Sequence, residues 1–323
     1  MRQRGSSTVL HVLLAVTLIT LSVGHSLCAE YAARIDELYA SQAPSAVFVS
    51  ELAKLVFAVP SLAVALRQKA PVSGQLFRIV LKMSVPAFLY TVVNIMSYYV
   101  IRDVGSTRYQ LFSNVKVVIT AVTFRAFLGV RLKLVQWFCV LLLVLGLCIG
   151  TIQSEETNAD AKALLLRGVV GIFVVSLCSS LAGVYFELCI KQAEVQPLLQ
   201  NFILYCWTCF MSFTHSSLFG SSLLVAALRG QFSAAMWLSI LTSSLYGQSV
   251  ALTLYYCDNM LKVFATSLAV FVSGVLESVC FASQPHSGTY YGGAVTILAT
   301  LVYYCDHNLL LEYDDTLIRR FLK

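Results

Sequence analysis

Long apolar runs follow one another along the whole chain, with short polar connections between them. A helix needs about 20 apolar residues to cross the hydrocarbon core of a bilayer, and backbone inside hydrocarbon must satisfy its own hydrogen bonds. The runs are therefore predicted to be membrane-spanning helices. We expect ten of them, near residues 8–28, 43–66, 83–102, 107–128, 134–152, 166–190, 198–219, 235–255, 263–282 and 289–311.

The composition places most of this chain in lipid. Hydrophobic residues make up 58% of the 323 residues and charged residues 12%, with a mean hydropathy of +0.79. Soluble domains carry roughly 25% charged residues, so a soluble protein of this composition would lack the polar groups to cover its surface. The longest polar stretch outside the spans, around 153–162, leaves no room for a soluble catalytic domain. We expect an all-α membrane protein, one polytopic domain over residues 1–323, that is not an enzyme and uses no metal, cofactor or nucleic acid.

Lysine and arginine residues in the connections predict the orientation, because they concentrate on the cytosolic side of membrane proteins. With the N-terminus in the cytosol, the cytosolic connections hold about twice as many of these residues as the opposite side. Both termini are then cytosolic, which requires an even number of spans. The ten spans divide into two five-helix halves, residues 8–152 and 166–311, followed by a short cytosolic tail at 312–323. An odd number per half inverts the second half, and inverted repeats place a substrate site at the midplane between them.

The first span has a second interpretation. Arg2 and Arg4 precede an apolar run from Val9 to Val23, and small residues near Cys28 have the character of a signal-peptidase site. The alternative is a first membrane helix that is retained. The even number of spans favours retention.

Charged side chains inside predicted spans are candidates for function, since each costs about 2.5–3.5 kcal/mol at the bilayer centre. Lys116 lies mid-span with no acidic residue within one helical turn, and Tyr109 and Ser113 fall on the same helix face. A lone cation beside polar groups suits an anionic ligand such as a phosphate. The alternative is a lysine that reaches the membrane interface or meets a distant carboxylate. Lys54 follows Glu51 by three residues, which allows an ion pair with a packing or gating role.

Other charged and polar residues lie near the cytosolic ends of later spans. Glu187 and Lys191 are an i,i+4 pair, for which we again expect a packing or gating role. Asp258 and Asn259 are good N-caps for the ninth span, and Lys262 follows them.

The third span carries an amide, Asn94, one turn after Tyr90. An amide in hydrocarbon either contacts a ligand or bridges helices through hydrogen bonds.

These patches occur together, in an order and at a spacing that resemble the nucleotide-sugar transporter family, in the branch of the CMP-sialic acid, UDP-galactose and UDP-N-acetylglucosamine transporters. The resemblance covers most of the chain, and the motifs are specific together although each is weak alone. The matching stretches are Glu51-Leu52-Ala53-Lys54; Ser84-Val85-Pro86 with Tyr90 and Asn94; Tyr109-Gln110 through Lys116 with Gln136-Trp137; and Ala182-Gly183-Val184-Tyr185-Phe186-Glu187 with Asp258-Asn259-Met260-Leu261-Lys262 and Phe264.

The resemblance implies the drug/metabolite transporter fold and a Golgi membrane location, with the endoplasmic reticulum membrane as the alternative. It implies antiport, in which a cytosolic nucleotide sugar, of the UDP-galactose or UDP-N-acetylglucosamine type, enters the lumen in exchange for the nucleoside monophosphate. The expected assemblies are a homodimer or a hetero-complex with related transporters or glycosyltransferases. The predicted substrate site consists of Lys116, Tyr109, Asn94, Ser113, Tyr185 and Tyr90.

The chain departs from the family pattern around the nucleotide. Val93 and Ile95 flank Asn94 where the family commonly has Gln and Asn, and Tyr255 replaces a lysine, so a second cation for the phosphate is predicted to be missing. Two alternatives stay open: a transporter of another metabolite, and a non-transporting membrane subunit of a transporter or glycosyltransferase complex.

Overall fold

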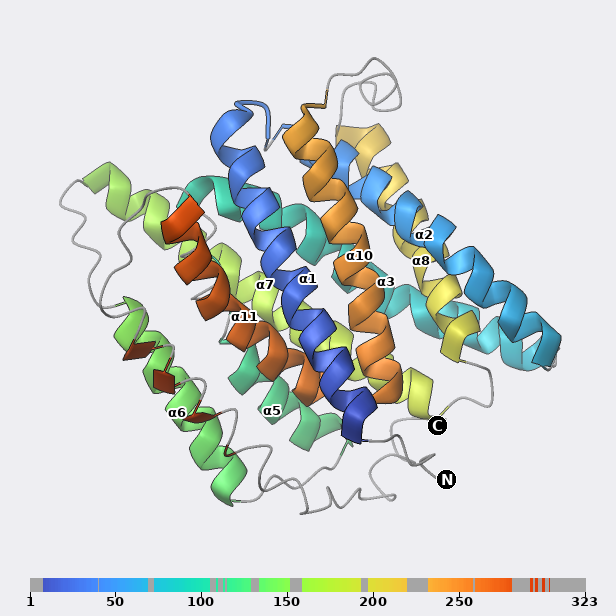
Figure 1. Cartoon of the computed structure of the whole chain (residues 1–323). Helices are drawn as coiled ribbons and strands as arrows, with labels where there is room; N and C mark the ends of the chain where they lie inside the picture. The colour runs from blue at the N-terminus through green and yellow to red at the C-terminus, as the bar shows by residue number, and fades with distance from the viewer. Residues whose placement is uncertain are drawn as a thin grey trace.

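In the computed structural model the chain forms a bundle of helices that lie side by side (Figure 1). No strand occurs among the described residues, which confirms the all-α prediction. The structure describes residues 8–39, 41–68, 73–104, 109, 113, 115–128, 134–151, 159–192, 197–219, 232–257, 259–280, 291, 292, 294, 295, 298, 299 and 302.

The labelled helices follow the predicted spans in order along the chain. The main differences are that α1 ends at Ile35 rather than near residue 28, α3 begins at Ser73 rather than near 83, and α7 begins at Ala159 rather than near 166. In addition, α5 begins at Lys116 rather than near 107, so Lys116 stands at the start of a helix and not in the middle of one. The span predicted at 289–311 falls mostly outside the described residues. The helices are α1 (Thr8–Ile35), α2 (Ala43–Gln68), α3 (Ser73–Val104), α5 (Lys116–Leu128), α6 (Leu134–Thr151), α7 (Ala159–Gln192), α8 (Pro197–Phe219), α10 (Ala234–Tyr256) and α11 (Asn259–Cys280).

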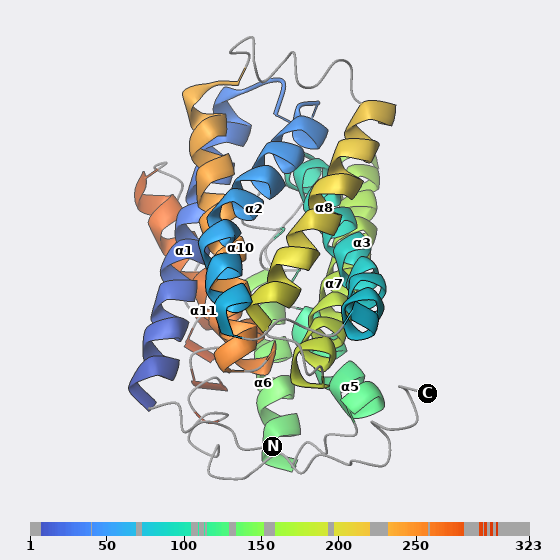
Figure 2. The same ribbon diagram turned by 90° about the vertical axis from the view of Figure 1, so that its right-hand side faces the viewer.

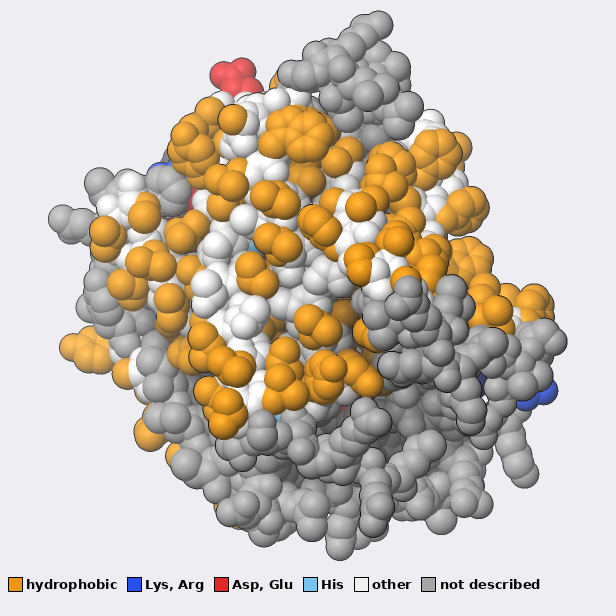
Figure 3. All heavy atoms as spheres, turned by 45° about the vertical axis from the view of Figure 1, so that its right-hand side comes forward, with side chains coloured by type: hydrophobic (Ala, Val, Ile, Leu, Met, Phe, Trp, Pro, Cys, Tyr) orange, Lys and Arg blue, Asp and Glu red, His pale blue; other side chains and the backbone are white. Residues whose placement is uncertain are grey.

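Five of the described helices are long and apolar enough to cross a membrane, over Val9–Ile35, Ala43–Pro60, Leu76–Asp103, Val170–Ile190 and Leu261–Cys280. Large apolar side chains remain exposed on the outside of the bundle, among them Val12 and Val16 of α1 and Phe210 and Phe213 of α8. Figure 3 shows hydrophobic side chains spread over the described part of one face. Water would disfavour a surface of this kind, whereas lipid solvates it.

Helix packing relates the first part of the chain to the second. α1 packs along α10 and α11, α7 packs along α3 and α5, and α2 and α8 lie against each other (Figures 1 and 2). α2 also contacts α10, and α8 contacts α3. Exchanging α1, α2, α3 and α5 with α7, α8, α10 and α11, in that order, converts each of these pairs into another observed pair, except the α2–α8 pair, which is converted into itself. Such an exchange is expected of two repeated halves.

Local contacts determine where two of the helices begin. The Ser233 hydroxyl accepts a hydrogen bond from the Met236 backbone N–H at 3.1 Å, so Ser233 caps α10. The backbone N–H of Asn259, the first residue of α11, donates to Glu187 Oε2 at 3.0 Å. A carboxylate is favoured at a helix N-terminus because it faces the positive end of the helix dipole. Glu187 therefore joins α7 to the start of α11.

Candidate functional site

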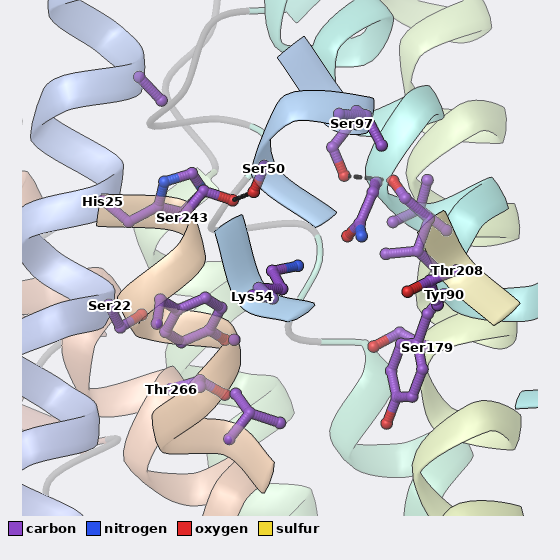
Figure 4. Close-up of a pocket in the computed structure, with 18 of the residues that line it drawn as sticks. Ser22, His25, Ser50, Lys54, Tyr90, Ser97, Ser179, Thr208, Ser243 and Thr266 are labelled. Carbon is purple, nitrogen blue, oxygen red and sulfur yellow. Dashed lines mark hydrogen bonds between the residues drawn. The ribbon is translucent and has the colours of Figure 1, made fainter. Parts of the chain in front are cut away.

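A cavity of about 260 Å³, lined by both polar and apolar side chains, lies between the helices (Figure 4). Residues from α1, α2, α3, α5, α7, α8, α10 and α11 line it, so both of the predicted halves contribute. Three of the described lining residues are lysines, namely Lys54, Lys116 and Lys262. Glu51 is the one carboxylate among the described lining residues. The described wall therefore carries a formal excess of two positive charges, with histidine neutral. Because a charge removed from water costs several kcal/mol unless it is compensated, this excess indicates an anionic occupant.

Lys54 is compensated by the protein itself. Its Nζ lies 2.7 Å from Glu51 Oε1, and both side chains are buried. The same carboxylate oxygen accepts a hydrogen bond from Asn94 Nδ2 at 2.8 Å, and Oε2 accepts one from Thr208 Oγ1 at 2.7 Å. We call these four residues the Glu51 network. It ties together α2, α3 and α8 and leaves neither carboxylate oxygen without a donor.

Lys116 and Lys262, which we call the lysine pair, are arranged differently. No carboxylate in the described part of the chain lies within ion-pair distance of the Lys116 ammonium. Lys262 interacts electrostatically with Lys116, which repels it, and with Glu187, which attracts it. Two like charges that face one cavity raise each other's energy, and an anion between them would lower it.

Glycines provide the space that two of the lysines occupy. A Cβ atom at Gly183 of α7 would lie 2.8 Å from Lys262 Nζ and 2.6 Å from Asn259 Oδ1. A Cβ atom at Gly247 of α10 would lie 2.6 Å from Lys54 Cε. All three distances are shorter than packed side chains tolerate, so any larger residue would push the lysine side chains away.

Five of the six predicted substrate residues line the cavity. Lys116, Tyr109 and Ser113, which were predicted to share a helix face, all line it, and so do Tyr90 and Asn94. The Asn94 amide already donates to Glu51, and the Tyr109 hydroxyl lies 2.7 Å from Ser97 Oγ.

The sixth predicted substrate residue, Tyr185, is placed elsewhere. Tyr185 is partly exposed and is not among the described lining residues, whereas the next residue, Phe186, is buried and lines the cavity. The difference of one position reflects the rotation of α7 about its axis.

The residues predicted to pack or gate are distributed as follows. Glu51 and Lys54 form the expected ion pair, and Glu187 binds the start of α11. Asn259 is buried beside Gly183 and is not among the described lining residues. The Lys191 side chain and Asp258 lie outside what the structure describes.

Lys262 lines the cavity, one turn inside α11. The structure differs from the expectation that a second cation is missing, because Lys262 lines the cavity together with Lys116.

Several polar lining residues were not identified from the sequence. They include His25 of α1, Asn201 of α8 and Tyr246 of α10. The His25 and Tyr246 rings stack with their centroids 5.8 Å apart and their planes 13° from parallel. Isolated polar residues of this kind occur in many apolar helices, so the sequence offered no signal that set them apart.

The sequence profile of a protein family described as nucleotide-sugar transporter matches residues 6–304 of this chain. CMP-sialic acid transporter 2 of rice (Oryza sativa subsp. indica) is 29% identical over 223 residues, which are 68% of this chain and 61% of the rice protein. The chain therefore matches less than two thirds of that relative's length. UDP-N-acetylglucosamine transporter of the rat (Rattus norvegicus) is 24% identical over 231 residues, 69% of this chain and 70% of the rat protein.

The fold also occurs among solved structures. One crystal structure superposes with a TM-score of 0.63 at 13% sequence identity, covering 98% of this chain and all of the other. At this identity the similarity concerns the fold alone.

Proposed function

The chain belongs to the nucleotide-sugar transporter family, and on that premise we propose that it exchanges a nucleotide sugar for a nucleoside monophosphate across the Golgi membrane, or the endoplasmic reticulum membrane. Membership of a transporter family confirms the expectation that the chain is not an enzyme. The observation that carries the proposal is the lysine pair, whose two cations line a central cavity without a carboxylate partner for Lys116 in the described structure.

The lysine pair suits a diphosphate-linked sugar. A nucleoside diphosphate sugar carries two neighbouring negative charges on its pyrophosphate, which match two ammonium groups that line one cavity. CMP-sialic acid also carries two neighbouring charges, one on its phosphate and one on the carboxylate of its anomeric carbon, so charge alone does not separate the two classes. We propose a UDP-sugar of the galactose or N-acetylglucosamine type as the substrate, in line with the similarity to the rat UDP-N-acetylglucosamine transporter, and UMP as the exchange partner.

The same two cations also suit the exchange partner. A phosphate monoester carries about −1.5 to −2 charges near neutral pH, close to the two charges of a pyrophosphate diester. Each solute would therefore compensate the lysine pair to a similar extent as the carrier reorients. An empty cavity would leave the Lys116 charge without a compensating anion, which disfavours reorientation without cargo. This difference couples import to export without ATP.

Alternating access requires that the cavity opens at one end at a time. Tyr39 and Tyr98, with ring centroids 5.0 Å apart, line the cavity close to the connection between α1 and α2. Phe186 and Leu254 line it near the C-terminal ends of α7 and α10. All four are buried. We propose that these two pairs of side chains close opposite ends of the cavity, within a fold of ten helices in two inverted halves, and that they separate in turn.

The test is transport by the purified full chain in proteoliposomes. Uptake of radiolabelled UDP-N-acetylglucosamine, UDP-galactose and CMP-sialic acid is measured with and without UMP inside. We expect internal UMP to accelerate uptake of at least one UDP-sugar, and Lys116→Met to abolish it. Lys82→Met is the matched control, because Lys82 is exposed on α3 and is not among the described lining residues.

Two results would contradict the proposal. An uptake rate that is the same with and without internal UMP would indicate that the protein transports a different solute. Folded protein that neither transports nor binds any nucleotide, but co-purifies with a transporter or glycosyltransferase, would indicate the non-transporting subunit.

A further inference from the structure

The cavity has a second polar region, on the side of α1, that the lysine pair does not account for. Figure 4 shows Ser22, His25, Ser50 and Ser243 on the other side of Lys54 from Tyr90 and Thr208. We call this region the serine lobe, and its lining residues are Ser22 and His25 of α1, Ser50 of α2, and Ser243 and Tyr246 of α10.

The serine lobe offers hydroxyl groups to an occupant. Ser50 Oγ donates to Ser243 Oγ at 3.3 Å, so the Ser243 hydroxyl acts as acceptor and retains its own hydrogen for a ligand. The stacked rings of His25 and Tyr246 add a flat aromatic wall beside these hydroxyls. A pocket that combines aromatic surface with a few fixed polar groups is typical of a small-molecule site.

We propose that the serine lobe binds the sugar of the nucleotide sugar, an uncharged hexose or N-acetylhexosamine, and that Ser243 donates a hydrogen bond to it. The inference rests on the proposed function and adds the substrate class. Apart from Lys54 at its edge, which Glu51 already compensates, no cation of the described lining residues lies in the lobe. A uronic acid, whose carboxylate lies far from the phosphates, would bring into the lobe a charge that nothing there balances.

The nucleotide base is better matched on the opposite side of the cavity. Asn201 of α8 has an amide oxygen, and Tyr90 of α3 a hydroxyl, that are buried without a hydrogen-bond partner in the described structure. The edge of a base presents coplanar donors and acceptors, which an amide matches and scattered hydroxyls do not. The lysine pair on α5 and α11 then holds the phosphates, and α1 packs against α11. The sugar, which follows the phosphates, therefore reaches the lobe on α1.

Ser243→Ala tests this placement with little risk to the fold. Ser50 loses Ser243 as a partner but keeps Ser244, whose hydroxyl also lies 3.3 Å away. The experiment compares the affinities of the purified full chain for UMP and for UDP-N-acetylglucosamine. We expect the affinity for UDP-N-acetylglucosamine to fall about tenfold, as for the loss of one hydrogen bond to a ligand, and the affinity for UMP to stay within about twofold.

The matched control is Ser249→Ala. Ser249 lies on the same helix, but its hydroxyl donates to the Tyr246 carbonyl oxygen at 2.7 Å and it is not a described lining residue. It should change neither affinity. A second variant, Ser243→Leu, fills the lobe and should exclude the sugar while UMP still binds.

Two outcomes would overturn the inference. If Ser243→Ala and Ser243→Leu leave the affinity for UDP-N-acetylglucosamine at the wild-type value, the sugar does not occupy the lobe. If the two variants lower the affinity for UMP as much as the affinity for UDP-N-acetylglucosamine, the lobe holds the base. Wild-type protein that binds neither ligand is a different result, because it removes the proposed function and this inference together.

Discussion

The Glu51 network and the lysine pair are two charged regions of one cavity, and they treat buried charge in opposite ways. In the network, one carboxylate receives hydrogen bonds from Lys54, Asn94 and Thr208. In the lysine pair, two cations repel each other, and the described structure holds no carboxylate within ion-pair distance of Lys116. The protein compensates the first region by itself, whereas Lys116 in the second has no carboxylate partner in the described structure and would gain one from an anionic solute. The Glu51 network should therefore determine the stability of the protein, and the lysine pair should determine its affinity for the ligand.

The largest effect is expected from Glu51→Ala. The substitution leaves the Lys54 ammonium buried without its partner and removes the acceptor of Asn94 and Thr208. Breaking a buried pair on one side costs about 3–5 kcal/mol of stability. Thermal unfolding of the purified protein measures the loss, and Glu51→Ala with Lys54→Met should recover much of it. Wild-type thermal stability in the single variant would show that the network does not hold the helices together.

Lys116→Met should have the opposite profile. It removes one charged hydrogen bond to the ligand, worth about 1.5–3 kcal/mol, so the affinity for UMP should fall roughly 10- to 150-fold. Stability without ligand should stay the same or rise, since an uncompensated buried charge is gone. A thermal-shift titration with UMP reads both quantities in one experiment. A ligand-free protein that is strongly destabilised, with wild-type affinity, would show that Lys116 belongs with the structural charges.

The contrast also shows which features of the structure could be predicted from the sequence. The helices were predictable because apolar runs of membrane length have few alternatives, and Lys116 was conspicuous because a cation in such a run is rare. Lys262 was assigned to a connection because Asp258 and Asn259 have the character of N-caps. In the structure α11 starts at Asn259, which places Lys262 one turn inside the helix.

Helix rotation was not predictable in the same way. Consecutive residues on a helix point about 100° apart, and α7 is apolar on most faces, so the pattern does not distinguish lipid from core. Tyr185 was therefore chosen where Phe186 faces the cavity. The serine lobe was not predictable from the sequence either, since its hydroxyls become a group only when α1, α2 and α10 come together.

Gly183→Ala should disturb the lysine pair without removing a charge. The new methyl group would meet Lys262 Nζ at 2.8 Å and Asn259 Oδ1 at 2.6 Å, so the ammonium must move. We expect the affinity for UMP to fall about tenfold, as for one misplaced hydrogen bond. Gly24→Ala on α1 is the control, because nothing lies within 4 Å of a Cβ atom there. Equal affinities in the two variants would mean that the position of Lys262 does not matter for binding.

The smallest effect is expected from Thr208→Val, which removes one donor from the Glu51 network. Lys54 and Asn94 still bond Glu51 Oε1, so the charge stays compensated and only Oε2 loses its partner. The loss should be about 1 kcal/mol of stability, with the affinity for UMP unchanged. Thr214→Val on the same helix is the control, because the Thr214 hydroxyl is exposed and, in the described structure, donates to the Phe210 carbonyl oxygen of its own helix. If Thr208→Val instead lowered the affinity for UMP and left the stability unchanged, the Glu51 network would take part in binding. The separation between the two charged regions would then not hold.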